Sequence, residues 1–264
     1  LVGFILPLTC RLKDKWVFLL ACVLLIQPLP LYYVIRACLD PSFITPAIPT
    51  RSFWDATFAV QSHGSFLETV RVNLWEGQIA SLAWAWDHGR VFQTAALFLL
   101  GMLIGRRGLF QKENLKVWNK ILAGALIAFF PLYGLGNMLP AFIVNKSILT
   151  PLSLIITSLS NFSFMLVLVS GVIFAFYNTN MHYLLMKITP YGKMSLTNYI
   201  TQSIVGSMLY YNWGFALHNQ CGITVSCLAG IAFFILQFTF CRWWMSHHSH
   251  GPMEYIWKRA TWLK

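Results

Sequence analysis

Long apolar runs, separated by short and mostly basic segments, dominate the pattern along the chain. About 20 apolar residues are enough for a helix to cross the ~30 Å hydrocarbon core of a bilayer. Six runs meet or approach this length, and an apolar stretch at residues 1–9 precedes them as the remnant of a further helix. The runs lie near Trp16–Ile35, Val91–Gly105, Ile121–Met138, Pro151–Tyr177, Ser195–Gly214 and Ile223–Trp243. The pattern predicts an all-α, polytopic transmembrane helix bundle that forms one integral membrane domain over residues 1–264.

Two segments outside these runs carry their own pattern. Residues 37–90 are too many for a simple loop, and Phe66–Trp86 has helix-like apolar spacing with three Trp residues. Either this is an amphipathic helix on the membrane surface, or it caps a cavity that opens outwards. Residues 244–264 place an apolar stripe opposite charged positions, which predicts a short amphipathic helix on the cytoplasmic surface.

Composition agrees with a membrane protein. The 264 residues are 57% hydrophobic and only 10% charged, with a mean hydropathy of +0.62. A soluble domain carries about 25% charged residues and has too little interior to hide this much apolar surface. These values exclude a soluble enzyme, a disordered tail and a small disulfide scaffold.

The net charge of +11 sets the expected orientation. The basic segments between alternate runs, together with the C-terminal tail, hold 14 of the 19 Lys and Arg residues. The positive-inside rule therefore places these segments and the C-terminus in the cytoplasm. The basic residues are scattered between apolar runs, which fits contact with the lipid bilayer rather than with nucleic acid.

The stretch 191–207 contains the most polar of the membrane runs. A turn at Tyr191–Lys193 is expected to precede a helix that Ser195 caps. Ser195, Asn198 and Gln202 then share one helix face, which Tyr199 flanks. A second row, Ser153, Thr157 and Asn161, recurs every four residues in the long run. Such rows either hold helices together by hydrogen bonds or line a cavity, and both interpretations stay open.

Asp87, His88 and Arg90 come directly before the short run. Histidine is the usual acid–base residue of enzymes, and a neighbouring aspartate can orient it. The alternative is an anchor at the outer membrane surface beside a belt of Trp residues. His247, His248 and His250 are too close together in sequence to converge on a tetrahedral metal site, so no metal is expected.

Two motifs carry a resemblance to a known family. The stretches GKMSLTNYITQS (residues 192–203) and GPMEYIWKRATW (residues 251–262) resemble the YeiB-type family, known as domain of unknown function 418, as does LFLLGMLIGRRGLF (residues 97–110). The residues that match its motifs include Gly192, Thr197, Gly251, Pro252, Glu254 and Trp257. Met253, Tyr255 and Lys258 are mild departures. Members normally begin with further helices that contain an Asp-x-x-Arg-Gly stretch, so the chain is expected to be an N-terminally truncated member.

The family is distantly similar to membrane acyltransferases, and this similarity implies the leading hypothesis. Acyl-CoA would be the co-substrate, with no covalently bound cofactor, and a small molecule, lipid or glycan would accept the acyl group. Lys193, Arg106 and Arg107 would lie near the donor's phosphates, with Asn198 and Gln202 along its path. His88 would be the base. The expected location is a bacterial cytoplasmic membrane.

A small-molecule transporter or exporter is the alternative. It could use the same polar rows as a binding site within the membrane. No inverted repeat and no helix pair broken by Gly or Pro is apparent in the sequence, which disfavours this alternative. A scaffold without catalytic activity is a third hypothesis, and the sequence does not predict the oligomeric state.

Overall fold

The computed structural model describes residues 2–40, 42–46 and 50–262, with the exception of the side chain of residue 179. Within this part of the chain every regular element is a helix. Three helical segments are long and apolar enough to cross a membrane, and two bent helix pairs raise this number to at most five. The structure confirms the all-α class and is compatible with a membrane protein, but it does not confirm six spans.

The chain divides into two compact units. Unit 1 comprises residues 1–50 and 81–177, and unit 2 comprises residues 51–80 and 178–264. The boundaries fall inside two helices, α4 (Thr50–His63) and α6 (Glu76–Asp87), and at the end of α9.

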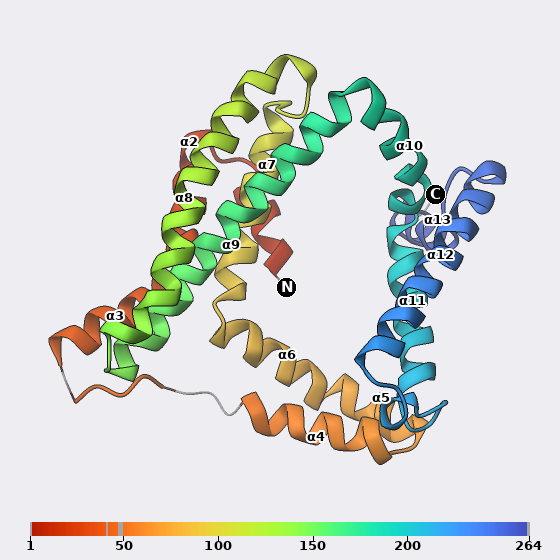
Figure 1. The fold of residues 1–264 in the computed structure, drawn as a ribbon, viewed down its shortest axis with the longest axis horizontal. Helices are drawn as coiled ribbons and strands as arrows, with labels where there is room; N and C mark the ends of the chain where they lie inside the picture. The colour runs from red at the N-terminus through yellow and green to blue at the C-terminus, as the bar shows by residue number, and fades with distance from the viewer. Residues whose placement is uncertain (1, 41, 47–49, 263–264) are drawn as a thin grey trace. The chain divides into compact units, whose positions relative to one another are not determined.

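Unit 1 is built on a pair of long helices that lie side by side, α8 (Leu115–Phe142) and α9 (Lys146–Tyr177) (Figure 1). Two short helices at the start of the chain, η1 (Val2–Phe4) and α1 (Ile5–Thr9), pack on α7 (Arg90–Arg106). The helix α2 (Asp14–Leu25) also packs on α7, and α3 (Pro28–Leu39) packs on α9. Buried apolar side chains of α2 and α7 form the core of this unit.

The predicted first span is not one helix. It breaks at Gln27, where α2 and α3 meet at 50°. Gln27 has φ 61° in the left-handed region, and Pro28 follows at the first turn of α3. A second break lies at Gly89, also with φ 61°, where the helices before it and α7 meet at 77°. The expectation that no helix pair is broken by Gly or Pro is therefore wrong, because single residues with positive φ interrupt both helices.

Unit 2 contains parts of α4 and α6, the whole of α5 (Phe66–Leu74) and four further α-helices. A capping box begins α5: Ser65 Oγ accepts from the backbone N–H of Glu68, and the Glu68 carboxylate accepts from the N–H of Ser65. The helix predicted at Phe66–Trp86 is two helices, α5 and α6, which are separated at Trp75. Residue Gln61 of α4 accepts a backbone hydrogen bond of 3.0 Å from Asn212.

The remaining helices of unit 2 are α10 (Thr179–Lys193), α11 (Ser195–Tyr210), α12 (Ile223–His247) and α13 (Pro252–Thr261), with a short η3 (Leu217–Asn219). The Asn178 side chain caps α10. The predicted turn at Tyr191–Lys193 is instead the last turn of this helix. Helix α10 packs on α11 and α12, and α13 packs on α11. The predicted tail helix is present, and residues 263–264 lie outside the described residues.

Candidate functional site

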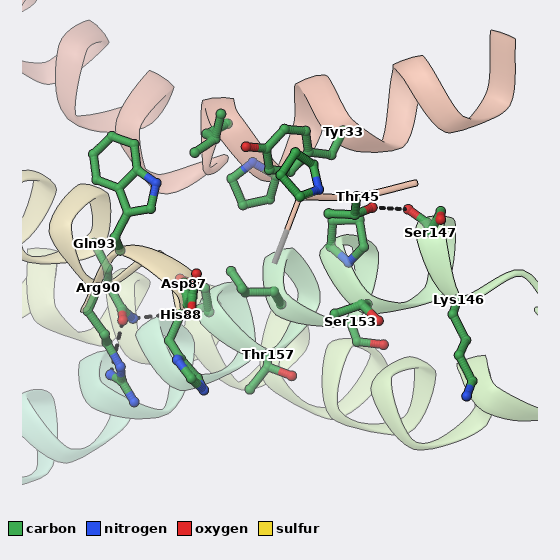
Figure 2. A pocket seen from close by; sticks show the side chains of 18 of the residues that line it. Tyr33, Thr45, Asp87, His88, Arg90, Gln93, Lys146, Ser147, Ser153 and Thr157 are labelled. Carbon is green, nitrogen blue, oxygen red and sulfur yellow. Dashed lines mark hydrogen bonds between the residues drawn. The ribbon is translucent and has the colours of Figure 1, made fainter. Parts of the chain in front are cut away.

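A cavity of about 770 Å³ lies within unit 1 (Figure 2). Its volume falls in the range of sites that bind small molecules. Residues of α3, the α6–α7 junction and the first half of α9 form its walls. The polar row predicted on α9 lines this cavity, together with the residues before the short span: Ser153, Thr157, Asn161, Asp87, His88 and Arg90.

Close packing at the two helix breaks brings α7 to this cavity. Gly89 lies against the side chain of Gln27, and a Cβ atom at Gly89 would collide with the Gln27 amide and come within 2.9 Å of Leu154 Cδ2. Gln27 is fully buried, and its Nε2 donates to Ser158 Oγ at 2.9 Å. Gln93 Nε2 donates to the carbonyl of the same serine at 3.3 Å. Residues at or near both helix breaks therefore donate hydrogen bonds to the same residue of α9, Ser158.

This contact fixes the level of His88 and Arg90 along α9. Ser158 lies twelve residues, or about 18 Å, from the first residue of α9. The sequence predicts these residues at the outer end of a span. In the structure the start of α7 lies beside Leu154 and Ser158, in the first half of the candidate membrane span α9, because the break at Gly89 lets α7 begin there.

His88 and Asp87 have separate partners. Nδ1 of His88 lies 3.0 Å from the carbonyl oxygen of Trp84, and the imidazole stacks on the Trp84 ring at 4.9 Å between centroids. Because a carbonyl only accepts, Nδ1 carries the proton and Nε2 is the basic nitrogen. Asp87 instead accepts a hydrogen bond from Thr50 Oγ1. A backbone carbonyl thus orients His88 where the sequence suggested Asp87.

The polar row of α11 lies in unit 2 and takes part in a hydrogen-bonded cluster. Gln202 Nε2 donates to Gln237 Oε1 at 2.9 Å and to the Tyr191 hydroxyl at 3.0 Å. Asn198 is buried, donates to the Tyr191 carbonyl at 3.0 Å and accepts from Cys241 Sγ at 3.2 Å. These bonds join α10, α11 and α12, as interhelical polar contacts in membranes do. Gln237, a polar residue within the apolar run of α12, was the sequence signal for this cluster, and the sequence-based prediction missed it.

The two motifs that suggested the family meet at the start of α11. The carboxylate of Glu254 on α13 accepts hydrogen bonds from the backbone N–H of Leu196 at 2.7 Å and of Thr197 at 3.0 Å, and from the Thr197 hydroxyl. Helix α11 begins at Ser195 without a side-chain cap of its own. The prediction that Ser195 caps α11 is wrong, because Glu254 satisfies these N–H groups from another helix.

Gly251 allows this contact, which we call the Glu254 clasp. A Cβ atom at Gly251 would collide with the Glu254 carboxylate and lie 3.0 Å from Met194 Cγ. Partial burial raises the pKa of Glu254, but the hydrogen bonds from Thr197 and Leu196 lower it more. The pKa of Glu254 is therefore below its ordinary value, and the carboxylate is charged at neutral pH.

Other predicted residues lie at the surface. Arg106 and Arg107 share the carboxylate of Asp14, at 3.3 Å and 3.0 Å. Lys193 and Gly192, at the end of α10, are exposed. Further exposed or half-buried side chains are Tyr199, Trp257 and Pro252. Within the described part of the chain, no three His, Cys, Asp or Glu side chains are grouped as a metal site requires.

Three curated proteins are similar to short parts of the chain. The uncharacterised protein YxaH of Bacillus subtilis (strain 168) is 30% identical over 95 residues, which are 36% of this chain and 24% of YxaH. An uncharacterised 39.9 kDa protein in the amylase 3' region of Bacillus acidopullulyticus is 32% identical over 78 residues, 30% of this chain and 22% of that protein. The uncharacterised protein YeiB of Escherichia coli (strain K12) is 29% identical over 83 residues, 30% of this chain and 20% of YeiB.

The chain thus matches about a quarter or less of the length of each of these relatives. No solved structure matches it significantly. A family model matches residues 104–264, which contain the α9 wall of the cavity, the polar cluster and the Glu254 clasp, and begin after His88. Because this match covers more than half of the chain, the protein belongs to the family described as protein of unknown function (DUF418).

Proposed function

We propose that the protein is a membrane acyltransferase and that the cavity of unit 1 is its acyl-acceptor site. The observation that carries the proposal is the setting of His88. A backbone carbonyl holds its Nδ1–H, and the other ring nitrogen is left to act as a base in a cavity of suitable size.

The proposed reaction is the transfer of an acyl group from acyl-CoA to a hydroxyl group. Nε2 of His88 takes the proton of the acceptor hydroxyl while the hydroxyl oxygen attacks the thioester carbonyl carbon of acyl-CoA. The new C–O bond forms, the C–S bond breaks, and the departing thiolate takes the proton back from His88. The N-terminus of α7, which begins at Arg90, supplies N–H groups and a positive dipole end for the negative charge that develops on the carbonyl oxygen.

The proposed donor contacts differ from those suggested by sequence alone. Arg106 and Arg107 already have Asp14 as a shared partner. Lys193 is exposed and makes no ion pair among the residues that the structure describes. Lys193 is therefore the one of these three basic residues without a partner charge in the described part of the chain.

The test measures release of free CoA from acyl-CoA by the complete protein in nanodiscs, with a thiol reagent as the readout. The variant His88→Gln removes the base and is expected to lower the rate at least 100-fold, because general base catalysis contributes about 10² to 10⁴. His247→Gln, an exposed histidine in unit 2, is the matched control. Normal turnover in His88→Gln would refute the proposal.

A transporter is a second candidate because of the two broken helices. Helix breaks at Gln27 and Gly89, both next to the α9 wall of one cavity, resemble the discontinuous helices that bind substrates in transporters. The probe is radiolabelled glycerol 3-phosphate outside proteoliposomes. Its uptake without chemical change, unaffected by His88→Gln, would favour transport over acyl transfer.

A further inference from the structure

Arg90 is a charged residue that lines the same cavity as the acidic residue Asp87. It makes no ion pair among the residues described here, in contrast to Arg106 and Arg107. It also lies beside the first half of α9, a candidate membrane span. The Arg90 side chain is exposed, and an arginine beside a membrane span needs an anion or water to meet its charge, so Arg90 is a candidate anion-binding residue.

Buried amide groups hold this arginine in place. Arg90 Nη1 donates to Gln93 Oε1 at 3.1 Å, and Gln93 in turn donates to the Ser158 carbonyl. Gln93 and Ser158 are both more than nine-tenths buried. The guanidinium also lies 5.8 Å from the centroid of the Trp84 ring. One donor of the guanidinium fork is therefore used for positioning, and the others have no hydrogen-bond partner among the residues that the structure describes.

The same tryptophan brings Arg90 and His88 together. Both side chains contact the Trp84 ring, and Figure 2 shows them next to each other at one end of the cavity. Asp87, the acidic residue of the cavity wall, is hydrogen-bonded to Thr50. An anion bound to Arg90 would therefore lie beside the basic nitrogen of His88 and close to the N-terminus of α7.

The cavity wall also has an apolar part beside the polar row of α9. Leu29, Tyr33, Ile44 and Leu154 belong to this part. Lys146 is the first residue of α9, about 18 Å along the helix from Ser158, and Figure 2 shows it at the opposite end of the view from Arg90. The ligand is thus expected to combine an anionic group with an apolar chain.

We propose that the acceptor is a phosphate-bearing amphiphile with a free hydroxyl group. The Arg90 guanidinium binds the phosphate, the hydroxyl lies at His88 Nε2, and the apolar chain runs along α3 and α9 towards Lys146. Arginine suits phosphate because its planar fork donates two parallel hydrogen bonds. This assignment rests on the proposed acyl transfer for the role of the hydroxyl, but not for the binding itself.

The test is calorimetric titration of the complete protein in detergent with short-chain, soluble lipids. The probe is dihexanoylphosphatidylglycerol. Dihexanoylphosphatidylcholine tests whether binding needs a net negative charge, and glycerol 3-phosphate tests whether binding needs the apolar chains. We expect phosphatidylglycerol to bind at least tenfold more tightly than either. Arg90→Gln should abolish the preference over phosphatidylcholine, and Lys120→Gln, an exposed lysine elsewhere in unit 1, should keep it.

Each outcome decides between alternatives. Equal binding of the two lipids, or a preference that survives in Arg90→Gln, would overturn the assignment. Glycerol 3-phosphate binding as tightly as the lipid would show a site for free phosphate esters instead. Arg90→Lys keeps the charge and should retain part of the preference, which separates lost binding from lost folding. His88→Gln should still bind phosphatidylglycerol but no longer transfer an acyl group. If the unchanged protein binds phosphatidylglycerol but transfers no acyl group, only the proposed acyltransferase is refuted. If it transfers acyl groups but does not prefer phosphatidylglycerol, only the lipid assignment is refuted.

Discussion

Removing the carboxylate of Glu254 should release α13 from α11. The variant Glu254→Ala takes away the acceptor of two backbone N–H groups and one hydroxyl. Hydrogen bonds to a charged group contribute about 1.5 to 3 kcal/mol each when buried. Glu254 is only partly buried, so water can replace part of this contribution, and we take about 2 kcal/mol for the whole clasp.

Hydrogen exchange followed by mass spectrometry measures this loss locally. A loss of about 2 kcal/mol corresponds to roughly 30-fold faster exchange if exchange follows the local opening equilibrium. The acceleration should be confined to peptides that contain α13 and the N–H groups of Leu196 and Thr197. Arg259→Gln, an exposed change on the same helix, should leave exchange unaltered.

A second variant checks the origin of the effect. Thr197→Val removes one donor of the clasp, and in the double variant with Glu254→Ala its effect should largely disappear, because both changes break one contact. Exchange in Glu254→Ala within threefold of the unchanged protein would refute the reasoning. It would mean that α13 is held by its apolar contacts and that the carboxylate adds little.

Three further predictions concern the same protein in detergent or nanodiscs. Because folding lowers the pKa of Glu254, the clasp is fully stable above pH 4.5, the ordinary pKa of the group, and weakens as the pH falls through the lower pKa of the folded state. Hydrogen exchange of α13 at pH 3 to 5 measures this loss. A clasp that becomes more stable on acidification would contradict the prediction. Gly89→Ala should lower the free energy of unfolding by about 2 to 4 kcal/mol, because Gly89 has a positive φ and the new methyl group would collide with Gln27. Gly101→Ala is the control, since open space surrounds its new methyl group, and it should not destabilise α7. The unfolding midpoints of the two variants test this, and equal midpoints would disprove the tight packing at Gly89. Gln237→Leu should lower the free energy of unfolding by about 1 kcal/mol, because it removes the acceptor of the Gln202 hydrogen bond. A higher unfolding midpoint in this variant would show that the polar cluster does not stabilise unit 2.

The structure also changes how the two polar rows are interpreted. In the sequence, the rows of α9 and α11 look alike, with Ser, Thr, Asn or Gln every three or four residues. The α11 row has partners on α10 and α12, and Gln237 completes a cluster that links the helices. The α9 row lines a cavity instead. Sequence spacing places polar residues on one helix face, but the neighbouring helix decides whether that face makes hydrogen bonds to a partner or borders a cavity.

The sequence alone determined the class of protein and the place of most helices. Runs such as Pro151–Tyr177 and Ile223–Trp243 correspond to α9 and α12 because apolar length and helical preference are local properties of the chain. It also identified both family motifs, since these are contiguous stretches. His88 and Asn161 were among its candidate residues, and they line the same cavity.

The contacts that these residues make follow from the packing of the helices. The break at Gln27 lies inside an apolar run, and its left-handed backbone depends on burial against Gly89 and a hydrogen bond to Ser158, 131 residues away. The cap of α11 comes from Glu254, 57 residues from Thr197. Short-range patterns predict where a helix is favourable, because they reflect backbone preference and apolar area. Breaks, caps and cavities depend on groups distant in sequence, and these meet only when the helices pack.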